Sequence, residues 1–151
     1  MPINDDIVLL KKFDFFSKMT TEQLRLLIFG AERRSFKAGD AIFHEGEQAE
    51  CAYVIHSGIV SLYRQKNDNI YPIDIINKPA LLNELALITE ITCSATALAQ
   101  SNCIALQISR IIFLRLINEF PEITRYIYDY VNERIRKLAN DVKRLPNLQN
   151  D

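Results

Sequence analysis

The segment at residues 82–95, LNELALITEITCSA, contains the side chains of this chain that are best suited to chemistry. Glu84 places a carboxylate at the start of a short apolar run, and Cys93 and Ser94 place a thiol beside a hydroxyl. A carboxylate accepts hydrogen bonds and a hydroxyl donates them, whereas a thiol reacts only when it is exposed and its pKa is lowered. The segment is therefore either a binding loop or an ordinary short helix and turn.

Each of these residues also has a purely structural interpretation. A carboxylate at the start of the helix ELALIT is stabilised by the positive end of the helix, which would explain Glu84 without a ligand. Cys93 has the size and polarity of a small buried apolar residue, and Ser94 suits a strand. The sequence leaves both interpretations of the segment open.

No other part of the chain has the spacing of a catalytic or metal site. The cysteines, Cys51, Cys93 and Cys103, are far apart and form no CxxC pair, which argues against a disulfide framework or a zinc site. His44 and His56 are isolated near turns, where histidines most often make local hydrogen bonds. We expect no enzyme activity, no metal and no bound cofactor.

The composition is that of a globular protein with one core. The chain has 151 residues, 48% of them hydrophobic and 25% charged, which suits a single domain over residues 1–151. The net charge of -1 gives no basic excess for nucleic acid. No apolar run approaches the roughly 20 residues of a membrane span, and the start MPINDDIVLLKK is unlike a secretory signal. We expect a cytoplasmic protein with no membrane contact.

The pattern of apolar residues divides the chain into helices, strands and helices again. Residues 5–30 have helical spacing, with Thr20 or Thr21 as a cap and Gly30 as an end. Residues 33–109 alternate as short strands separated by the turns AGD, EGE, HSG and KNDN, which is typical of a barrel or sandwich. Residues 110–145 predict two helices, the first capped by Ser109 and the second starting at Pro121.

The same order of segments resembles the cyclic-nucleotide-binding domain family of the catabolite-activator type. The matching stretches are FDFFSKMTTEQLRLL, FKAGDAIFHEGE, YVIHSGIVSLY and LNELALIT, followed by the strand pair and the Pro121 helix, over about residues 13–145. The resemblance implies an α+β fold. This fold is an antiparallel β-roll of jelly-roll type with N-terminal helices and a long C-terminal helix.

The resemblance also assigns roles to the segment at residues 82–95. In the family, a loop glycine lets the backbone approach the ligand, a glutamate accepts a hydrogen bond from the ribose, and an arginine holds the cyclic phosphate. The resemblance implies that Glu84 keeps the ribose position and that Ser94 keeps a hydroxyl donor. Asn83, however, replaces the glycine, and Cys93 replaces the arginine.

These replacements weaken the expected phosphate site. A buried charge without its partner costs about 3–5 kcal/mol, which corresponds to at least a hundredfold in affinity. Upstream, Pro79 and Ala80 replace the usual glycine-aspartate turn, and proline lacks the N–H that such a turn needs. The sequence leaves open whether another cation reaches the site; the candidates are Arg33, Arg34, Arg64 and Lys78. The predicted ligand site, if a ligand binds, consists of Asn83, Glu84, Leu85, Cys93 and Ser94.

The C-terminal helix carries a short apolar seam. Its members follow one another at intervals of three and four residues, as in a coiled coil, and are Tyr128, Val131, Ile135, Leu138, Val142 and Leu145. We expect a homodimer through this helix, with a helix packed only on its own domain as the alternative. Residues 133–145 hold five basic and two acidic side chains, a mild excess that suits a helix end better than a DNA contact.

These observations leave three hypotheses for function. The first is a stand-alone sensor or regulatory module that has weak or lost binding of cAMP and cGMP and acts through protein partners or another ligand. The second is a true cyclic-nucleotide receptor with a rearranged phosphate site. The third is a transcription regulator of the catabolite-activator type seen without its DNA-binding domain, since we expect no DNA contact from this chain alone.

Overall fold

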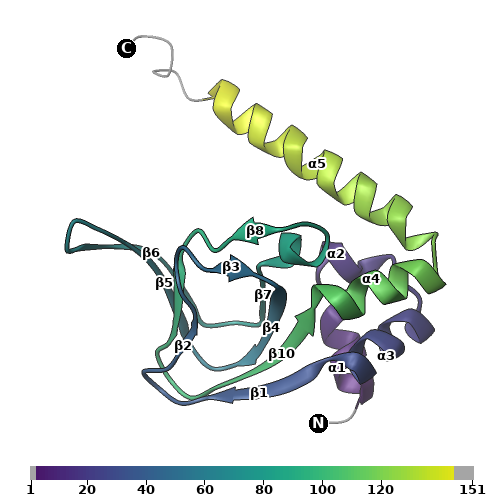
Figure 1. The fold of residues 1–151 in the computed structure, drawn as a ribbon, viewed down its shortest axis with the longest axis horizontal. Coiled ribbons are helices and arrows are strands. Elements are labelled where there is room, and N and C mark those ends of the chain that lie inside the picture. Colours follow the sequence, from purple (N-terminus) through teal and green to yellow (C-terminus); the bar gives the residue numbers. More distant parts are fainter. Residues whose placement is uncertain (1–2, 145–151) are drawn as a thin grey trace.

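The computed structural model describes the backbone of residues 3–144 and the side chains of residues 3–140. It begins with three helices that pack together on one side of the strands (Figure 1). They are α1 (Ile3–Lys11), α2 (Asp14–Ser17) and α3 (Thr21–Gly30). The predicted cap of α3 is confirmed: the Gln23 amide donates to Thr20 Oγ1 at 3.1 Å, and the Thr20 amide donates to Gln23 Oε1 at 3.0 Å. This reciprocal pair fixes where α3 begins.

The strands form two four-stranded antiparallel sheets that face each other as a roll (Figure 1). One sheet has the order β1-β10-β4-β7, the other β2-β9-β5-β6, and β3 and β8 form a separate pair. The strands are β1 (Glu32–Phe36), β2 (Ala41–Phe43), β3 (Gln48–Ala49), β4 (Cys51–Ser57), β5 (Val60–Lys66), β6 (Asn69–Ile76), β7 (Ala80–Leu82), β8 (Ile91–Thr92), β9 (Thr96–Ala99) and β10 (Cys103–Ser109).

Alternation along β4 divides the apolar interior into two clusters. Ala52 and Val54 point toward the helices and belong to an apolar cluster that also contains the buried side chains of the helices. Tyr53 and Ile55 point the opposite way, into a second cluster inside the roll. Successive side chains of a strand point to opposite faces, so a strand such as β4, with apolar residues at successive positions, needs cover on both sides. The helices cover one face of this sheet, and the second sheet covers the other.

Glycine and asparagine make the tight turns between strands. Gly39, Gly46 and Gly58 all have positive φ, as expected for turns at these positions. A Cβ atom on Gly58 would lie 2.5 Å from the Asn102 carbonyl oxygen, so no larger residue fits there. Asn67 and Asp68, each with positive φ, make the β5–β6 hairpin turn.

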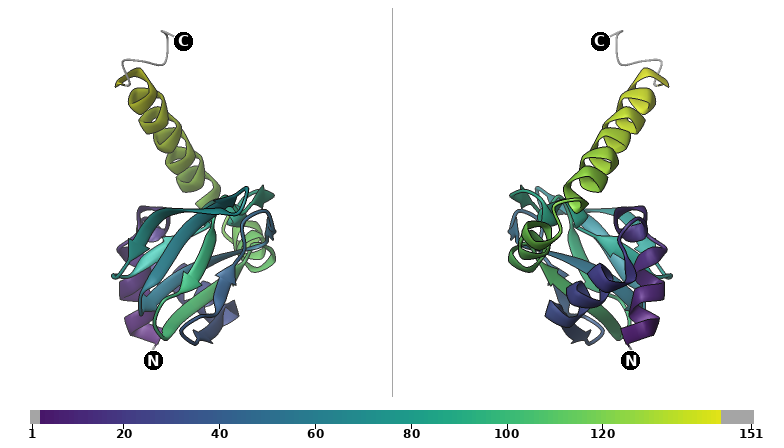
Figure 2. Two further views of the ribbon diagram at one scale, coloured as in Figure 1. Left: turned by 90° about the vertical axis from the view of Figure 1, so that its left-hand side faces the viewer. Right: turned by 90° about the vertical axis from the view of Figure 1, so that its right-hand side faces the viewer.

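Two helices complete the fold, α4 (Arg110–Glu119) and α5 (Ile123–Arg144). Ser109 caps α4 as predicted, because its Oγ accepts a hydrogen bond from the Ile112 amide at 3.2 Å. The predicted start of α5 at Pro121 is wrong by two residues, since Pro121 and Glu122 form a turn before the helix. The first turns of α5 are buried at Ile123 and Ile127. Beyond them the helix extends away from the strands (Figure 2).

The predicted fold class is confirmed: an antiparallel β-roll with N-terminal helices and a long C-terminal helix. None of the helices in residues 3–144 is long and apolar enough to cross a membrane.

Candidate functional site

The segment at residues 82–95 links the two sheets across one end of the roll. It leaves β7, makes the four-residue 3-10 turn η1 (Glu84–Leu87), pairs briefly as β8 and enters β9. The short helix predicted here is therefore a single tight turn. Ala86 and Leu87 are buried and anchor the turn in the core. Leu85, a predicted site residue, is half-buried, and its carbonyl accepts hydrogen bonds from the amides that close the turn.

Asn83 preserves the backbone conformation that a glycine would allow. Its φ of 61° and ψ of 35° lie in the left-handed region. Asparagine tolerates this region better than other residues with a Cβ atom. Asn83 therefore has a backbone conformation that a glycine at this position could also adopt. What it adds is a side chain, whose Nδ2 donates to Cys93 Sγ at 3.6 Å.

The two departures from the family loop thus contact each other. Cys93 is only 3% exposed and packs in the cluster inside the roll. Burial raises the pKa of the Cys93 thiol, the Asn83 amide lowers it in part, and the Glu47 carboxylate raises it further. A buried thiol with a raised pKa stays protonated at neutral pH, so Cys93 is an inert packing residue rather than a redox sensor.

A small cavity of about 230 Å³ opens beside this pair. Its walls include Cys93, Asn83, Cys51 and the rings of Phe43 and Tyr53. Glutamates stand among its lining residues, while no lysine or arginine does among the described side chains. The site where the resemblance predicts an anion clamp is therefore without a cation in its wall.

None of the four candidate substitute cations is among the residues that line this cavity. Arg33 pairs with buried Asp6 at 2.5 Å, far from the loop. Arg34 donates to Gln107 Oε1 at 2.6 Å, so it stands behind a cavity wall rather than in it. Lys78 is exposed and is not among the lining residues.

Arg64 is the candidate that touches the loop. Its Nε donates to the Ser94 carbonyl at 2.8 Å, next to Cys93 in the sequence. Arg64 is otherwise exposed, as is the Ser94 side chain. A guanidinium therefore lies beside the loop, supplied by β5 instead of the loop itself.

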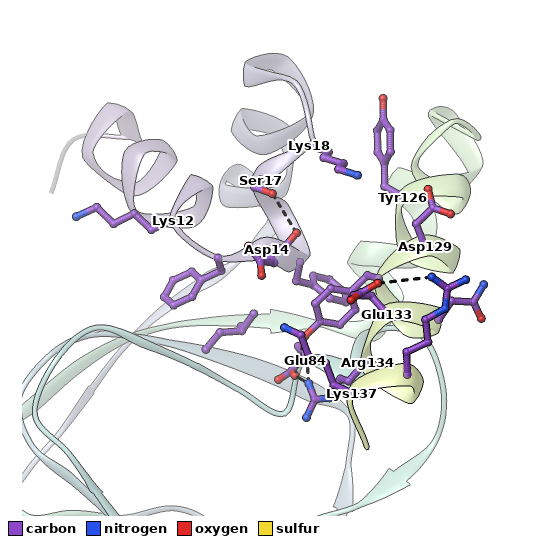
Figure 3. Close-up of a pocket in the computed structure, with 16 residues that line it drawn as sticks. Lys12, Asp14, Ser17, Lys18, Glu84, Tyr126, Asp129, Glu133, Arg134 and Lys137 are labelled. Atoms are coloured by element: carbon purple, nitrogen blue, oxygen red, sulfur yellow. Dashed lines mark hydrogen bonds and ion pairs between the residues drawn. The ribbon is translucent and has the colours of Figure 1, made fainter. Parts of the chain in front are cut away.

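Glu84, the predicted ribose residue, is bound to the C-terminal helix. It is paired with Arg134, and Tyr130 Oη donates to the same carboxylate oxygen at 3.1 Å (Figure 3). Arg134 also donates to Tyr130 Oη at 3.1 Å. The Glu84 side chain is 13% exposed, and the Arg134 side chain is 46% exposed. Sequence reasoning missed both partners because they lie off the apolar seam.

Tyr130 connects this carboxylate to the N-terminal helices. Its ring meets Phe15 of α2 edge-on, with centroids 5.1 Å apart. Burial raises the pKa of Tyr130, and the nearby Asp14 carboxylate raises it further. The phenol therefore remains a hydrogen-bond donor to Glu84 well above neutral pH.

A cleft of about 890 Å³ lies between α2 and α5, with Glu84 among its lining residues (Figure 3). Its α5 wall is mainly polar and includes Asp129, Glu133 and Lys137. Lys18 and Asp14 contribute charge from the other wall. Charges of both signs are interspersed, which gives the cleft no clear preference for anions or cations.

The predicted seam of α5 is largely exposed. Tyr128, Ile135 and Leu138 are 66%, 57% and 59% exposed, whereas Val131 is half-buried against its own core. Val142 lies in α5, but its side chain is outside the described side chains, and Leu145 lies outside the described residues.

The potential metal ligands of the chain are its His, Cys, Asp and Glu side chains. Among the described side chains, no three of His, Cys, Asp and Glu gather as metal ligands. His44 is exposed, and His56 Nδ1 is buried without a hydrogen-bond partner in the described part of the chain.

Comparison with known proteins agrees with the fold. A family model described as "Cyclic nucleotide-binding domain" matches residues 33–120. The solved structure of a cyclic nucleotide-binding-like protein from Brucella abortus is 39% identical, with a TM-score of 0.71 over 76% of this chain and 98% of that one.

Two further relatives place similar domains in different proteins. The N-terminal domain of a transcriptional regulator from Streptomyces coelicolor is 25% identical, with a TM-score of 0.81 over 93% of this chain and 99% of that one. Lysophospholipase NTE1 of Pyricularia oryzae is 28% identical over 138 residues, 89% of this chain. The chain spans only 9% of that enzyme's length.

Proposed function

Since the chain belongs to the cyclic nucleotide-binding domain family, we propose that it is a regulatory module with weak or lost binding of cAMP and cGMP. The observation that supports this most is the contact between Asn83 and buried Cys93, which stands where the family places a phosphate-binding arginine. The contact closes the anion end of the pocket with two uncharged side chains. Glu84, the ribose residue, is meanwhile held by Arg134.

The magnitude of the effect follows from the lost pairing. A charge-assisted, often bidentate bond to phosphate is replaced by a thiol that offers only a weak donor. Loss of such a bond costs at least a hundredfold in affinity. Competition from Arg134 for Glu84 lowers the affinity further, because a ribose hydroxyl must share or displace an existing ion pair.

Calorimetry with cAMP and cGMP tests this proposal. We expect no micromolar binding to the wild-type protein and a gain of about a hundredfold in Cys93→Arg. Thr92→Arg is the matched control, because it adds the same charge one residue away on an exposed side chain. Micromolar or tighter binding to the wild type would overturn the proposal. If binding is weak but Cys93→Arg gives no gain, Asn83 and Pro79 have closed the pocket as well.

One observation favours the second candidate, a true receptor with a rearranged phosphate site. Arg64 lies on the Ser94 carbonyl and brings a positive charge to the phosphate end of the loop from β5. In that case cAMP binds the wild type, and Arg64→Gln abolishes the binding. Lys66→Gln, an exposed charge on the same strand, serves as the control. Equal affinity in wild type and Arg64→Gln would dismiss this candidate.

We also propose that the protein is a homodimer through α5. Support comes from the exposed apolar side chains Tyr128, Ile135 and Leu138 on one side of the helix. Sedimentation is expected to give twice the chain mass, reduced to one chain by Leu138→Asp. Asn140→Asp adds the same charge on the opposite flank of α5 and is expected to leave the dimer intact. A monomeric wild type at high concentration would contradict the proposal.

The output of the module is proposed to be a protein partner in the cytoplasm. The net charge of -1 and the mixed charges of α5 support a protein rather than DNA as partner. We assign no catalytic step to the chain itself. The Streptomyces relative, a regulator domain, supports the alternative in which DNA binding belongs to a further domain. A reading frame that continues past Asp151 into a helix-turn-helix would favour that alternative.

A further inference from the structure

The small cavity beside Asn83 and Cys93 has aromatic walls on one side. Phe43 comes from β2 and Tyr53 from β4, so the two rings belong to opposite sheets of the roll. Their centroids are 5.7 Å apart and their planes are inclined by 33°. Both residues line the cavity, which places the two aromatic rings side by side along it.

The charge around this cavity is negative. Glu47 and Glu50 are among its lining residues, and no described lysine or arginine is. Next to burial, which has the largest effect, the Glu47 carboxylate contributes to the raised pKa values of Cys93 and Tyr53. Arg34, held behind the wall by Gln107, acts on Tyr53 in the opposite sense. Glu47 therefore lines the cavity, whereas Arg34, the guanidinium that acts on Tyr53, is not among its lining residues.

We propose that this cavity binds a small organic cation of the ammonium class, held between the rings of Phe43 and Tyr53 and the carboxylate of Glu47. The inference rests on the proposed function, because a pocket that still held a nucleotide phosphate at Cys93 would be closed to a cation. It differs from that function in the sign of the ligand charge that the site accepts.

Three physical features support a cation. Ammonium ions are attracted to the faces of aromatic rings, most strongly where water is excluded. A carboxylate among the lining residues, such as that of Glu47, offers an ammonium group a charge-assisted contact. The volume of about 230 Å³ is below the usual range of pockets for drug-sized ligands, so the ligand is small.

Choline and its neutral isostere 3,3-dimethylbutan-1-ol are the probes that separate charge from shape. The readout is a proton–nitrogen NMR titration of the full chain, in which the side-chain amide of Asn83 reports directly on the cavity. We expect choline to shift this signal with an affinity about tenfold higher than that of the isostere. Equal affinities, or no shift with either compound, would overturn the inference.

Two variants locate the site. Glu47→Gln is expected to weaken choline binding about fivefold or more, while Glu119→Gln, the same change on a distant exposed side chain, leaves it unchanged. Phe43→Leu keeps most of the packing and removes a ring, so it also weakens choline but not the isostere. Equal choline affinity in Glu47→Gln and the wild type would overturn the inference. This outcome can be measured even if Phe43→Leu does not fold. A parallel cAMP titration identifies failure of the proposed function separately, since only that failure produces nucleotide binding.

Discussion

The two ends of the loop at residues 82–95 differ in different ways from the nucleotide site that the family resemblance predicts. At the start, Glu84 is the residue type predicted for the ribose, but its carboxylate is bound by Arg134 and Tyr130. At the other end, Cys93 stands where an arginine is predicted, and its contact Asn83 has a left-handed backbone that a glycine would also allow. The Glu84 end therefore differs in the residues that bind its side chain, and the Cys93 end differs in the chemical type of the side chain.

The difference teaches that residue type and residue function are separable in this loop. A residue of the predicted type, such as Glu84, is uninformative about a ligand when Arg134 and Tyr130 of α5 already bind one of its carboxylate oxygens. A changed type such as Asn83 preserves the loop geometry, because asparagine is among the few residues that accept positive φ. Each end therefore needs its own test, one directed at the partner and the other at the backbone and the thiol.

The largest expected effect is at the Glu84 end, through its contact with α5. Arg134→Met keeps the apolar stem and removes the charge, leaving a 13% exposed carboxylate with Tyr130 alone. Because Arg134 is partly solvated, we expect a cost of about 2 kcal/mol, between the values for exposed and buried pairs. Urea unfolding followed by circular dichroism measures this cost.

The matched control for that prediction is Arg136→Met on the same helix. Arg136 is 77% exposed and lies 4.0 Å from Glu133, so its removal should cost less than about 0.5 kcal/mol. Equal costs for the two variants would mean that Glu84 is not held by α5 in solution, and the contrast between the loop ends would disappear.

The next effect in size concerns the backbone at Asn83. Asn83→Ala is expected to destabilise the protein by about 1–2 kcal/mol, because alanine pays the full penalty of the left-handed region. Asn83→Gly removes the same amide contact to Cys93 without that penalty and should stay close to the wild type. If both variants lose the same stability, the amide contact rather than the backbone conformation carries the role of Asn83.

The order of helices and strands was predictable because its signals are local. Alternation in β4, the glycine turns and the caps at Thr20 and Ser109 each depend on a few neighbouring residues. The start of α5 was misplaced because proline is compatible both with a first helical turn and with the preceding turn, and the buried position of Ile123 decides between them.

The partners of the site residues were not predictable for the opposite reason. Tyr130 and Glu84 are 46 positions apart in the sequence, and they contact each other only because the fold brings α5 next to η1. The contact of Asn83 with Cys93 spans ten positions and depends on how the loop closes. Residue types along the chain give a list of candidate site residues, but only the packed structure determines which of them contact each other.

The smallest expected effect is the pH dependence that the buried thiol confers. Burial raises the pKa of Cys93 above its ordinary value of 9.0, so the folded chain holds this proton to higher pH than the unfolded chain does. The resulting stability is fully present below the unfolded pKa and is lost as pH rises from there through the folded pKa. The free energy of unfolding should therefore fall as the pH rises above the ordinary thiol value of 9.0, and it should fall less steeply in Cys93→Ala. Ser94→Ala, which removes a neighbouring group that does not titrate, should keep the wild-type slope, and only the slopes are compared because truncation itself changes stability. An unchanged slope in Cys93→Ala would show that this thiol does not hold its proton more tightly in the fold, and the phosphate end of the loop would then be more open to water than its burial indicates.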